Sequence, residues 1–185
     1  PSNPYAATKA SAELLINSYV KTYDLDCVIT RCTNNYGPRQ FYEKLIPKTI
    51  FLANQDKKIP IYGTGKNIRD WIFVDDHCEA VYDVLLNGKS GESYNISSNN
   101  ELDNTTIVKT ILEIMNKSDN LIEFVDDRPG HDLRYSLDSS KIRKSLKWAE
   151  KTTFQEGLEK TIEWYLKSDN QSITKESLNP TPWKK

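Results

Sequence analysis

Segments typical of β-strands alternate with segments typical of α-helices along most of this 185-residue chain. Short runs rich in β-branched and aromatic residues, which favour strands, are separated by longer stretches with helical spacing of apolar residues. Strands joined through helices tend to pair in parallel, so the alternation predicts an α/β fold with at least some parallel pairing. The expected strands are 26–31, 59–62, 71–74, 93–96 and 122–125, and the expected helices are 4–23, 45–54, 76–86, 105–115, 139–146 and 154–166.

The charge balance argues against two classes of partner. The chain has 25 basic and 26 acidic residues, for a net charge of −1. Proteins that bind nucleic acids or anionic membranes usually carry a basic surplus or basic blocks, so we expect neither partner. No apolar run approaches the ~18 residues of a membrane span, and we expect no signal peptide.

Cysteine and histidine are too few and too scattered for a metal site. Cys27, Cys32 and Cys78 are odd in number and lack C-x-x-C spacing, and only His77 and His131 could join them. Zinc sites need four ligands at closer, regular spacing, so we expect no metal. The pattern fits a reducing, cytoplasmic setting.

Glycine is scarce, with seven residues in the chain. No arrangement of them reads G-x-G-x-x-G or G-x-x-x-x-G-K-S/T, the loops that cradle nucleotide phosphates. The chain therefore carries no recognisable phosphate loop of its own.

Tyr5 and Lys9 stand four residues apart in the first expected helix, so their side chains project from the same face. A nearby ammonium favours the phenolate, which can take a proton from a substrate hydroxyl. Taken alone, the pair is more often a solvated surface feature. The small residues around it would let a flat ring approach closely.

The segment around this pair, PYAATKASAELL (4–15), resembles the active-site helix of extended short-chain dehydrogenases/reductases. Later segments are similar, in the same order, to the nucleotide-sugar 4,6-dehydratases of that family. They are RCTNNYGPRQFYEKLIP (31–47), IPIYGTGKNIRDWIFVDDHCEAV (59–81), YNISSNNELDN (94–104), DDRPGHDLRYSLDSSKIRKSL (126–146) and FQEGLEKTIEWYL (154–166).

The resemblance implies the C-terminal part of an NAD(P)-binding, Rossmann-like enzyme. The family places its glycine-rich loop, and a Thr-Asp-Glu set that supplies a hydroxyl, an acid and a base, in the half before the tyrosine helix. We expect this chain to lack that half. The expected division is a Rossmann remnant with the tyrosine helix (1–40), a mainly substrate-binding region with returning Rossmann elements (41–167), and a polar tail (168–185).

The implied reaction is dehydration of dTDP-glucose or UDP-glucose to a 4-keto-6-deoxy sugar, for rhamnose-type deoxysugar synthesis. Bound NAD takes and returns a hydride, Tyr5 and Lys9 are catalytic and also touch NAD, and the full-length enzyme is expected to be a homodimer. The chain alone is expected to be inactive. The alternatives are a non-catalytic sugar-nucleotide-binding or dimerisation module and a sibling epimerase or decarboxylase.

The resemblance also assigns ligand contacts. Asn35 is expected at the nicotinamide end of NAD and Asn34 at the sugar diphosphate, although both could instead bond their own backbone in a turn. Arg69 and Arg128 are candidates to grip the pyrophosphate, because guanidinium groups bind phosphate in bidentate fashion. Their alternative is structural pairing with the acids beside them, namely Asp70, Asp126, Asp127 and Asp132.

The remaining candidates line the expected nucleotide and sugar sites. His131 lies in the same loop as Arg128. Lys44 stands at the first turn of a helix, where the helix dipole favours anions, so its position is explained if it reaches a ligand phosphate. Asn104 would be a helix N-cap on sequence grounds alone. The full set of expected substrate contacts is Asn34, Lys44, Leu45, Pro60, Tyr62, Arg69, Asn104, Arg128 and His131.

Overall fold

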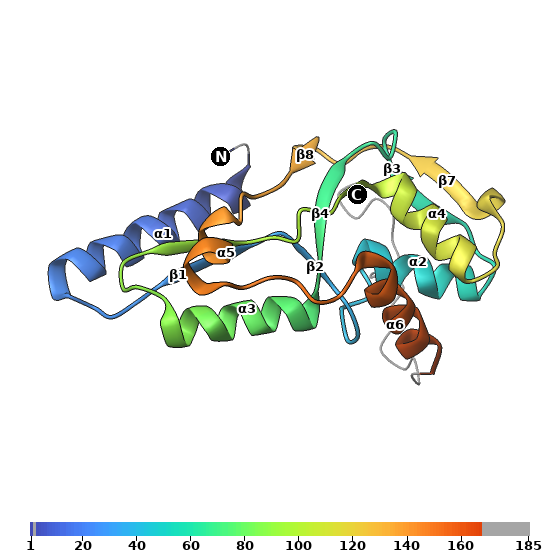
Figure 1. Ribbon diagram of the computed structural model, residues 1–185. Helices are drawn as coiled ribbons and strands as arrows, with labels where there is room; N and C mark the ends of the chain where they lie inside the picture. Colours follow the sequence, from blue (N-terminus) through green and yellow to red (C-terminus); the bar gives the residue numbers. More distant parts are fainter. Residues whose placement is uncertain (2, 168–185) are drawn as a thin grey trace.

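The elements form two lobes connected by a central group of strands (Figure 1). This arrangement comes from a computed structural model, which describes residue 1 and residues 3–167. The expected polar tail at 168–185 lies outside the described residues. We name the lobes after one helix of each, the α1 lobe and the α6 lobe.

The α1 lobe is a two-stranded parallel sheet between helices. Strands β1 and β5 pair in parallel, with α1 on one side and α3 on the other (Figure 1). Its core is formed by Ile72, Ala80, Val84, Tyr94, Ile96, Ile142 and Trp148. Its elements are α1 (Pro4–Tyr23), β1 (Ile29–Cys32), α3 (Val74–Asn87), β5 (Ser93–Ile96) and α5 (Ser140–Leu146).

The N-terminal helix is well capped but poorly buried. The Asn3 side chain accepts a hydrogen bond from the Ala6 N–H at 2.9 Å, and Pro4 occupies the first turn, where its missing N–H costs nothing. The helix ends at Asp24, which adopts the left-handed conformation. No residue of α1 is fully buried, and its apolar Ile16 and Val20 are only half-buried.

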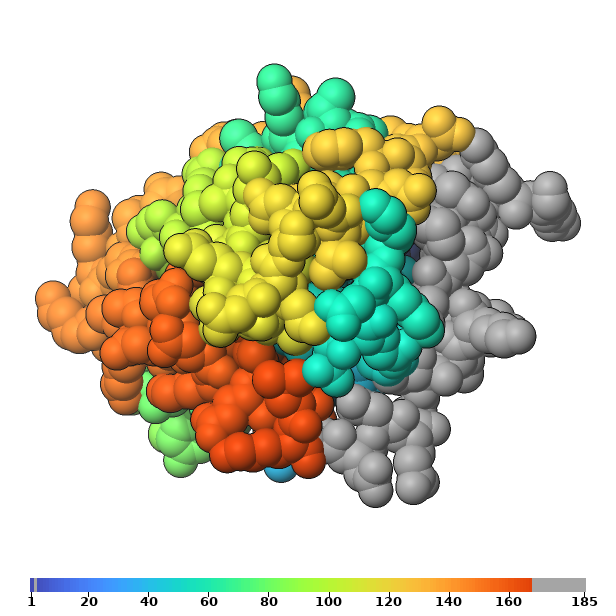
Figure 2. All heavy atoms as spheres, turned by 90° about the vertical axis from the view of Figure 1, so that its right-hand side faces the viewer, coloured from blue at the N-terminus to red at the C-terminus, as the bar shows by residue number. Residues whose placement is uncertain are grey.

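The α6 lobe packs three helices beside a second parallel pair of strands. Figure 2 shows α2, α4 and α6 side by side on the face that lies at the right of Figure 1. Strands β3 and β7 pair in parallel. The elements are α2 (Leu45–Asn54), β3 (Ile59–Tyr62), α4 (Asn104–Ile114), a 3-10 turn (Asp119–Leu121), β7 (Ile122–Val125) and α6 (Phe154–Lys167).

Four strands connect the lobes: β2 (Asn34–Tyr36), β4 (Ile68–Phe73), β6 (Glu101–Asp103) and β8 (Arg134–Tyr135). β4 pairs with β2 and β8 in parallel and with β6 in antiparallel fashion. Its end is anchored in the core of the α6 lobe, where Trp71 and Phe73 pack around Tyr36. The start of β4, at Ile68 and Arg69, therefore lies on a firmly held strand.

Most of the elements expected from sequence are confirmed. Helices 4–23 and 45–54 and strands 59–62, 93–96 and 122–125 have the expected bounds, and the other four helices agree within two residues. Parallel pairing is present in four places, which confirms the α/β class.

Three expectations about strands were wrong. The strand expected at 26–31 is Ile29–Cys32, because Cys27 bonds the turn after α3 instead of β5: its carbonyl accepts from the Gly91 N–H at 2.8 Å. The strand expected at 71–74 begins earlier, at Ile68, and ends at Phe73. The segment 33–40, expected as a loop, contains β2, whose polar residues gave no strand signal.

Within the described residues, no helix is both long enough and apolar enough to cross a membrane.

Candidate functional site

The helix that carries Tyr5 and Lys9 is joined to β1 by an ion pair. The Arg31 guanidinium donates to both carboxylate oxygens of Glu13, from Nε at 2.8 Å and from Nη2 at 2.5 Å. Its third donor, Nη1, reaches Asn95 on β5 at 3.3 Å. The hydrogen bond from Arg31 holds the pKa of Glu13 below its usual value. Tyr5 itself is 74% exposed, so its hydroxyl is open to a ligand.

The first turn of α1 faces the loop that carries Arg128. A Cβ added to Gly130 would lie 3.9 Å from the Cβ of Asn3, two residues before Tyr5. The tyrosine helix and the proposed pyrophosphate grip therefore flank the same region, although they are more than 100 residues apart in sequence.

Tyr135 also belongs to this region, and the sequence analysis missed it. Its hydroxyl donates to the Cys32 carbonyl at 3.1 Å, and it lies opposite Arg69 in the pairing of β8 with β4. Burial raises the pKa of Tyr135, and the neighbouring Cys32 and Tyr5 raise it further. A two-residue strand gives no signal by which sequence alone could have found this position.

Asn34 and Asn35 lie on β2, just after β1 ends. The Asn35 amide donates to Cys32 Sγ at 3.3 Å and weakly to the Thr33 carbonyl at 3.5 Å, so part of the turn-like bonding expected as an alternative is present. The Asn35 Oδ1 atom, however, is buried without a hydrogen-bond partner. A buried acceptor left in this state is costly unless a ligand supplies a donor. Asn34 is half-buried and lies opposite Trp71.

Arg69 is buried at the start of β4 and is held by backbone carbonyls. Its Nη2 donates to the Asp132 carbonyl at 2.8 Å and its Nη1 to the Ile68 carbonyl at 2.6 Å. Burial lowers the pKa of Arg69, and the nearby positive charge of Arg128 lowers it further. The two guanidinium groups thus stand close enough to repel each other.

The alternative that Arg69 pairs with Asp70 is wrong. Successive side chains of a strand point to opposite faces, and the buried Asp70 carboxylate faces the turn after β5. It accepts hydrogen bonds from the Ser98 hydroxyl at 3.0 Å, the Asn100 N–H at 3.1 Å and the Asn99 N–H at 3.2 Å.

Asp127 organises the loop between β7 and β8. Its Oδ1 accepts from the Arg128 N–H at 2.8 Å and contacts Nδ1 of His131 at 2.7 Å. The His131 ring meets the Tyr62 ring edge to face, with centroids 6.4 Å apart. Burial raises the pKa of Tyr62, whereas Arg128 opposes that shift. Tyr62, Arg69, Arg128 and His131 therefore form one cluster, which we call the arginine cluster.

The other expected substrate contacts surround this cluster less closely. Lys44 is the N-cap position of α2, exposed and paired with Glu43 at 2.5 Å, and Leu45 is the first residue of that helix. The charge of Glu43 also raises the pKa of Tyr62, after the larger effect of burial. Pro60 lies on β3, opposite Glu123 of β7. It is two residues before Tyr62 and therefore points to the same face of the strand.

The expectation that Asn104 caps its helix was wrong. Asp103 is the N-cap of α4, and its carboxylate accepts from the Thr106 N–H at 2.9 Å. The Asn104 N–H donates to the Asn67 carbonyl at 3.2 Å, while the Asn67 amide donates to the Asp132 carbonyl, also at 3.2 Å. Asn104 is thereby linked to the loop of the arginine cluster.

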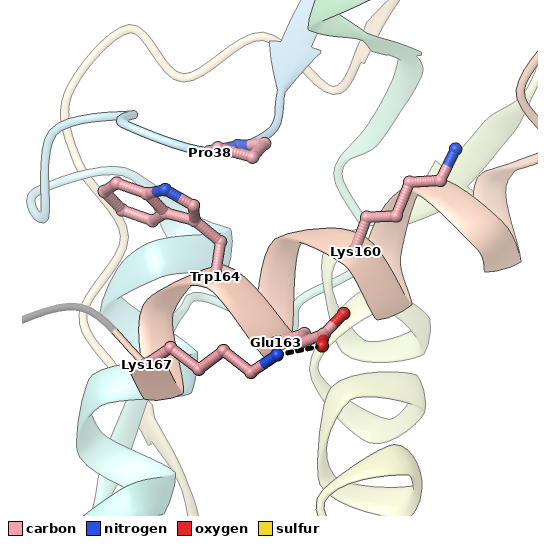
Figure 3. A pocket seen from close by; sticks show the side chains of 5 residues that line it. All are labelled: Pro38, Lys160, Glu163, Trp164 and Lys167. Carbon is pink, nitrogen blue, oxygen red and sulfur yellow. Dashed lines mark hydrogen bonds and ion pairs between the residues drawn. The ribbon is translucent and has the colours of Figure 1, made fainter.

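A shallow hollow of about 380 Å³ lies on α6, away from the expected site residues. Figure 3 shows Pro38 facing Trp164 across it, with Lys160, Glu163 and Lys167 along the helix and Lys167 paired with Glu163. None of the expected catalytic or ligand-contacting residues lines it.

Residues 1–161 match the model of the family described as GDP-mannose 4,6 dehydratase. The chain belongs to this family. Its α/β arrangement with parallel strand pairs matches the Rossmann-like fold of extended short-chain dehydrogenases/reductases.

Curated relatives and solved structures align with most of the chain. It is 47% identical to a dTDP-glucose 4,6-dehydratase of Neisseria gonorrhoeae, over 93% of this chain and 52% of that protein. The crystal structure of dTDP-glucose 4,6-dehydratase from Bacillus anthracis with NAD is 46% identical, with a TM-score of 0.87, over 90% of this chain and 53% of that one. UDP-glucuronic acid 4-epimerase from Bacillus cereus, solved with UDP-glucuronic acid and NAD, is 28% identical, with a TM-score of 0.85, over 90% and 53% of the two chains.

The chain spans about half the length of the curated relatives that it matches.

Proposed function

We propose that this chain is the sugar-nucleotide-binding part of an NAD-dependent nucleotide-sugar 4,6-dehydratase and supplies its Tyr5–Lys9 pair. The observation that carries the proposal is the arginine cluster. Two guanidinium groups held close together repel each other, and a doubly negative pyrophosphate between them removes that repulsion. Arg69 keeps its position through backbone carbonyls, so this part of the grip is in place before a ligand binds.

The residues that would hold NAD are Tyr5, Lys9 and Asn35. The buried, unpartnered Oδ1 of Asn35 fits an amide donor such as the nicotinamide carboxamide. When bound, NAD supplies a hydride acceptor for the sugar and later returns the hydride. Tyr5, with Lys9 one turn further along the same face of α1, takes the proton of the hydroxyl being oxidised.

Loss of water from the sugar requires an acid and a base that the family resemblance places before the tyrosine helix. The chain spans about half the length of its curated relatives. We therefore propose that the 185-residue chain on its own binds nucleotide but does not dehydrate the sugar.

The dehydratase is favoured over the sibling epimerase by relatedness. The B. anthracis dehydratase is 46% identical to the chain, against 28% for the B. cereus epimerase, at nearly equal structural similarity. We propose dTDP-glucose as the sugar nucleotide, with UDP-glucose as the competitor to test, and a place in rhamnose-type deoxysugar synthesis.

The same proposal extends to the domain division, the oligomeric state and the cellular location of the protein. We infer a division at about residue 40 between a part with the tyrosine helix and a mainly substrate-binding part. A homodimer of the longer enzyme is supported by the exposed apolar side chains of α1, at Leu14, Leu15, Tyr19 and Tyr23. The three free thiols support a reducing, cytoplasmic setting.

Calorimetric titration of the purified chain with thymidine diphosphate tests the proposal. Arg69→Ala should weaken binding about 30-fold, because a charge-assisted hydrogen bond to phosphate contributes about 2 kcal/mol. The matched control is Arg134→Gln, which removes an exposed guanidinium from the neighbouring strand, where it pairs with Glu101. Equal losses in the two variants, or no binding by the parent chain, would contradict the proposal, and so would turnover of dTDP-glucose by the chain alone.

A further inference from the structure

The protonation pattern of the arginine cluster is set by the contact between Asp127 and His131. The Asp127 pKa is held below its usual value by the His131 hydrogen bond and by the Arg128 N–H, against the effect of its own burial. An ionised carboxylate can only accept, so the bridging hydrogen belongs to Nδ1 of the histidine. Nε2 is then the ring nitrogen without a proton.

Asp127 can lie this close to the ring because Gly63, the residue just after β3, has no side chain. A Cβ added to Gly63 would lie 3.0 Å from Oδ2 of Asp127 and 3.1 Å from its Cγ. The carboxylate lies between the Gly63 backbone and His131; the Asp127 side chain is 45% exposed and that of His131 6%. This packing fixes the ring orientation as well as the tautomer.

Burial and charged groups of both signs act on the pKa of His131. Arg69 on β4 and Arg128 on the loop both disfavour a positive ring, and burial disfavours it more strongly. Asp127 favours the positive ring and raises the pKa of His131. Asp132 raises the pKa of Arg69 in the same cluster, and the Tyr62 ring of β3 contacts the His131 ring. A diphosphate would cancel the two guanidinium charges and add negative charge beside the ring.

We propose that His131 takes up a proton when a nucleoside diphosphate binds between Arg69 and Arg128. Asp127 is the residue that positions the His131 ring. The proton comes from solvent, and the Nε2–H bond is the only covalent bond that forms. The charged ring then adds a third donor to the pyrophosphate grip, and Asp127 balances its charge from behind. The inference rests on the proposed function and adds a proton linkage to it.

The chain is well suited to a direct test because it has two histidines. His77, on α3 in the other lobe, is the internal control: burial lowers its pKa too, with no contribution from the arginine cluster. Proton–carbon NMR of the two ring Cε1–H groups, assigned with His77→Gln, reports each midpoint separately. Thymidine diphosphate should raise the His131 midpoint by about one pH unit or more and leave that of His77 in place. Thymidine without phosphate should move neither.

Calorimetry in two buffers of different ionisation enthalpy measures the proton uptake itself. Binding of thymidine diphosphate should take up a fraction of a proton at neutral pH and weaken by up to about tenfold per pH unit as the pH rises between the free and bound midpoints. His131→Gln should abolish both effects. Asp127→Asn can still accept both hydrogen bonds but lacks the charge, so it should lower the His131 midpoint in the free and bound forms.

The outcomes separate this inference from the proposed function. Binding that depends on Arg69 but shifts no His131 midpoint and takes up no proton would overturn the inference and leave the proposed function intact. Failure of the chain to bind thymidine diphosphate would overturn the proposed function, and this inference with it. An Asp127→Asn midpoint equal to that of the parent would remove Asp127 from its positioning role.

Discussion

Arg69 and Asp70 are neighbours on β4, and their side chains have different roles because they point to opposite faces of the strand. Arg69 presents a guanidinium to the loop of Arg128, while Asp70, which is fully buried, holds the turn after β5 through three hydrogen bonds. That turn contains Asn99 in the left-handed conformation, which needs local stabilisation. Asp70 is therefore a structural residue beside Arg69, for which we propose a role in binding.

At this scale we predict that Asp70→Asn destabilises the chain. An amide has one acceptor oxygen, so its NH₂ group would face a donor that now bonds the carboxylate, and losing such charged hydrogen bonds costs about 2 kcal/mol. Urea unfolding followed by circular dichroism measures the change. Asp119→Asn, at an exposed carboxylate 3.4 Å from Lys109, should stay within about 0.5 kcal/mol. Equal effects in the two variants would argue against this role of Asp70.

Single residues also show what sequence could predict of the site. The residue types of the arginine cluster were found because guanidinium groups in a Pro-Gly loop and beside a strand are suited to phosphate, and the family resemblance supplied their grouping. The role of Asp127 was not foreseen: three acids flank Arg128, and only the fold decides which of them meets His131. The Asn104 cap was misplaced by one residue because Asp103 is an equally good capping residue.

Among the helices, α6 is fitted to the strands by a glycine in its first half. Gly157 has no room for a side chain: a Cβ there would lie 2.4 Å from the Tyr36 hydroxyl oxygen and 2.8 Å from a ring carbon of Phe73. The Tyr36 hydroxyl is held in place by the Phe154 carbonyl at 3.1 Å. The helix backbone thus packs directly on β2.

We predict that Gly157→Ala lowers stability although alanine is the better helix former. The gain in helix propensity is about 1 kcal/mol, whereas overpacking against a fixed ring costs about 1–3 kcal/mol, so a net loss of about 1 kcal/mol is expected. Thermal and urea unfolding provide the measurement. Glu159→Ala, on the solvent side of the same helix, serves as control, and a more stable Gly157→Ala protein would refute the packing argument.

Elements differ in how far local sequence determines them. The α6 face with Leu158, Ile162 and Tyr165 is buried as its helical spacing indicates. β2, β6 and β8 were not predicted because they are two or three residues long, and their pairing with β4 depends on contacts far along the chain. A short polar segment becomes a strand only where a partner strand is already in place.

Across the whole molecule, the extent of burial differs between the helices of the two lobes. α2 buries seven of its ten residues, whereas α1 buries none of its twenty. The Glu13–Arg31 ion pair is then a main attachment of α1 to the rest of the described chain. Local opening free energies follow such differences in burial.

We predict that α1 opens without global unfolding and that Glu13→Gln increases its opening. Amide hydrogen exchange in α1 should accelerate by about fivefold or more in the variant, with exchange in α2 and α4 unchanged. Because the pKa of Glu13 is lowered in the folded state, its contribution is present above its ordinary value and is lost as the pH falls through the folded value. Acid should therefore loosen α1 first. Glu163→Gln, at an exposed pair on α6, is the control, and uniform protection of all helices would contradict the prediction.

The contact between Gly157 and Tyr36 has a consequence for the evolution of the proposed cofactor site at Asn35. Asn35 precedes Tyr36 on β2 and points to the opposite face of that strand, so any sideways displacement of the strand by α6 also moves the Asn35 amide. Substitutions in a helix that touches no ligand can in this way retune how a dinucleotide is held. A search for altered cofactor preference should therefore include α6 as well as the residues that line the site.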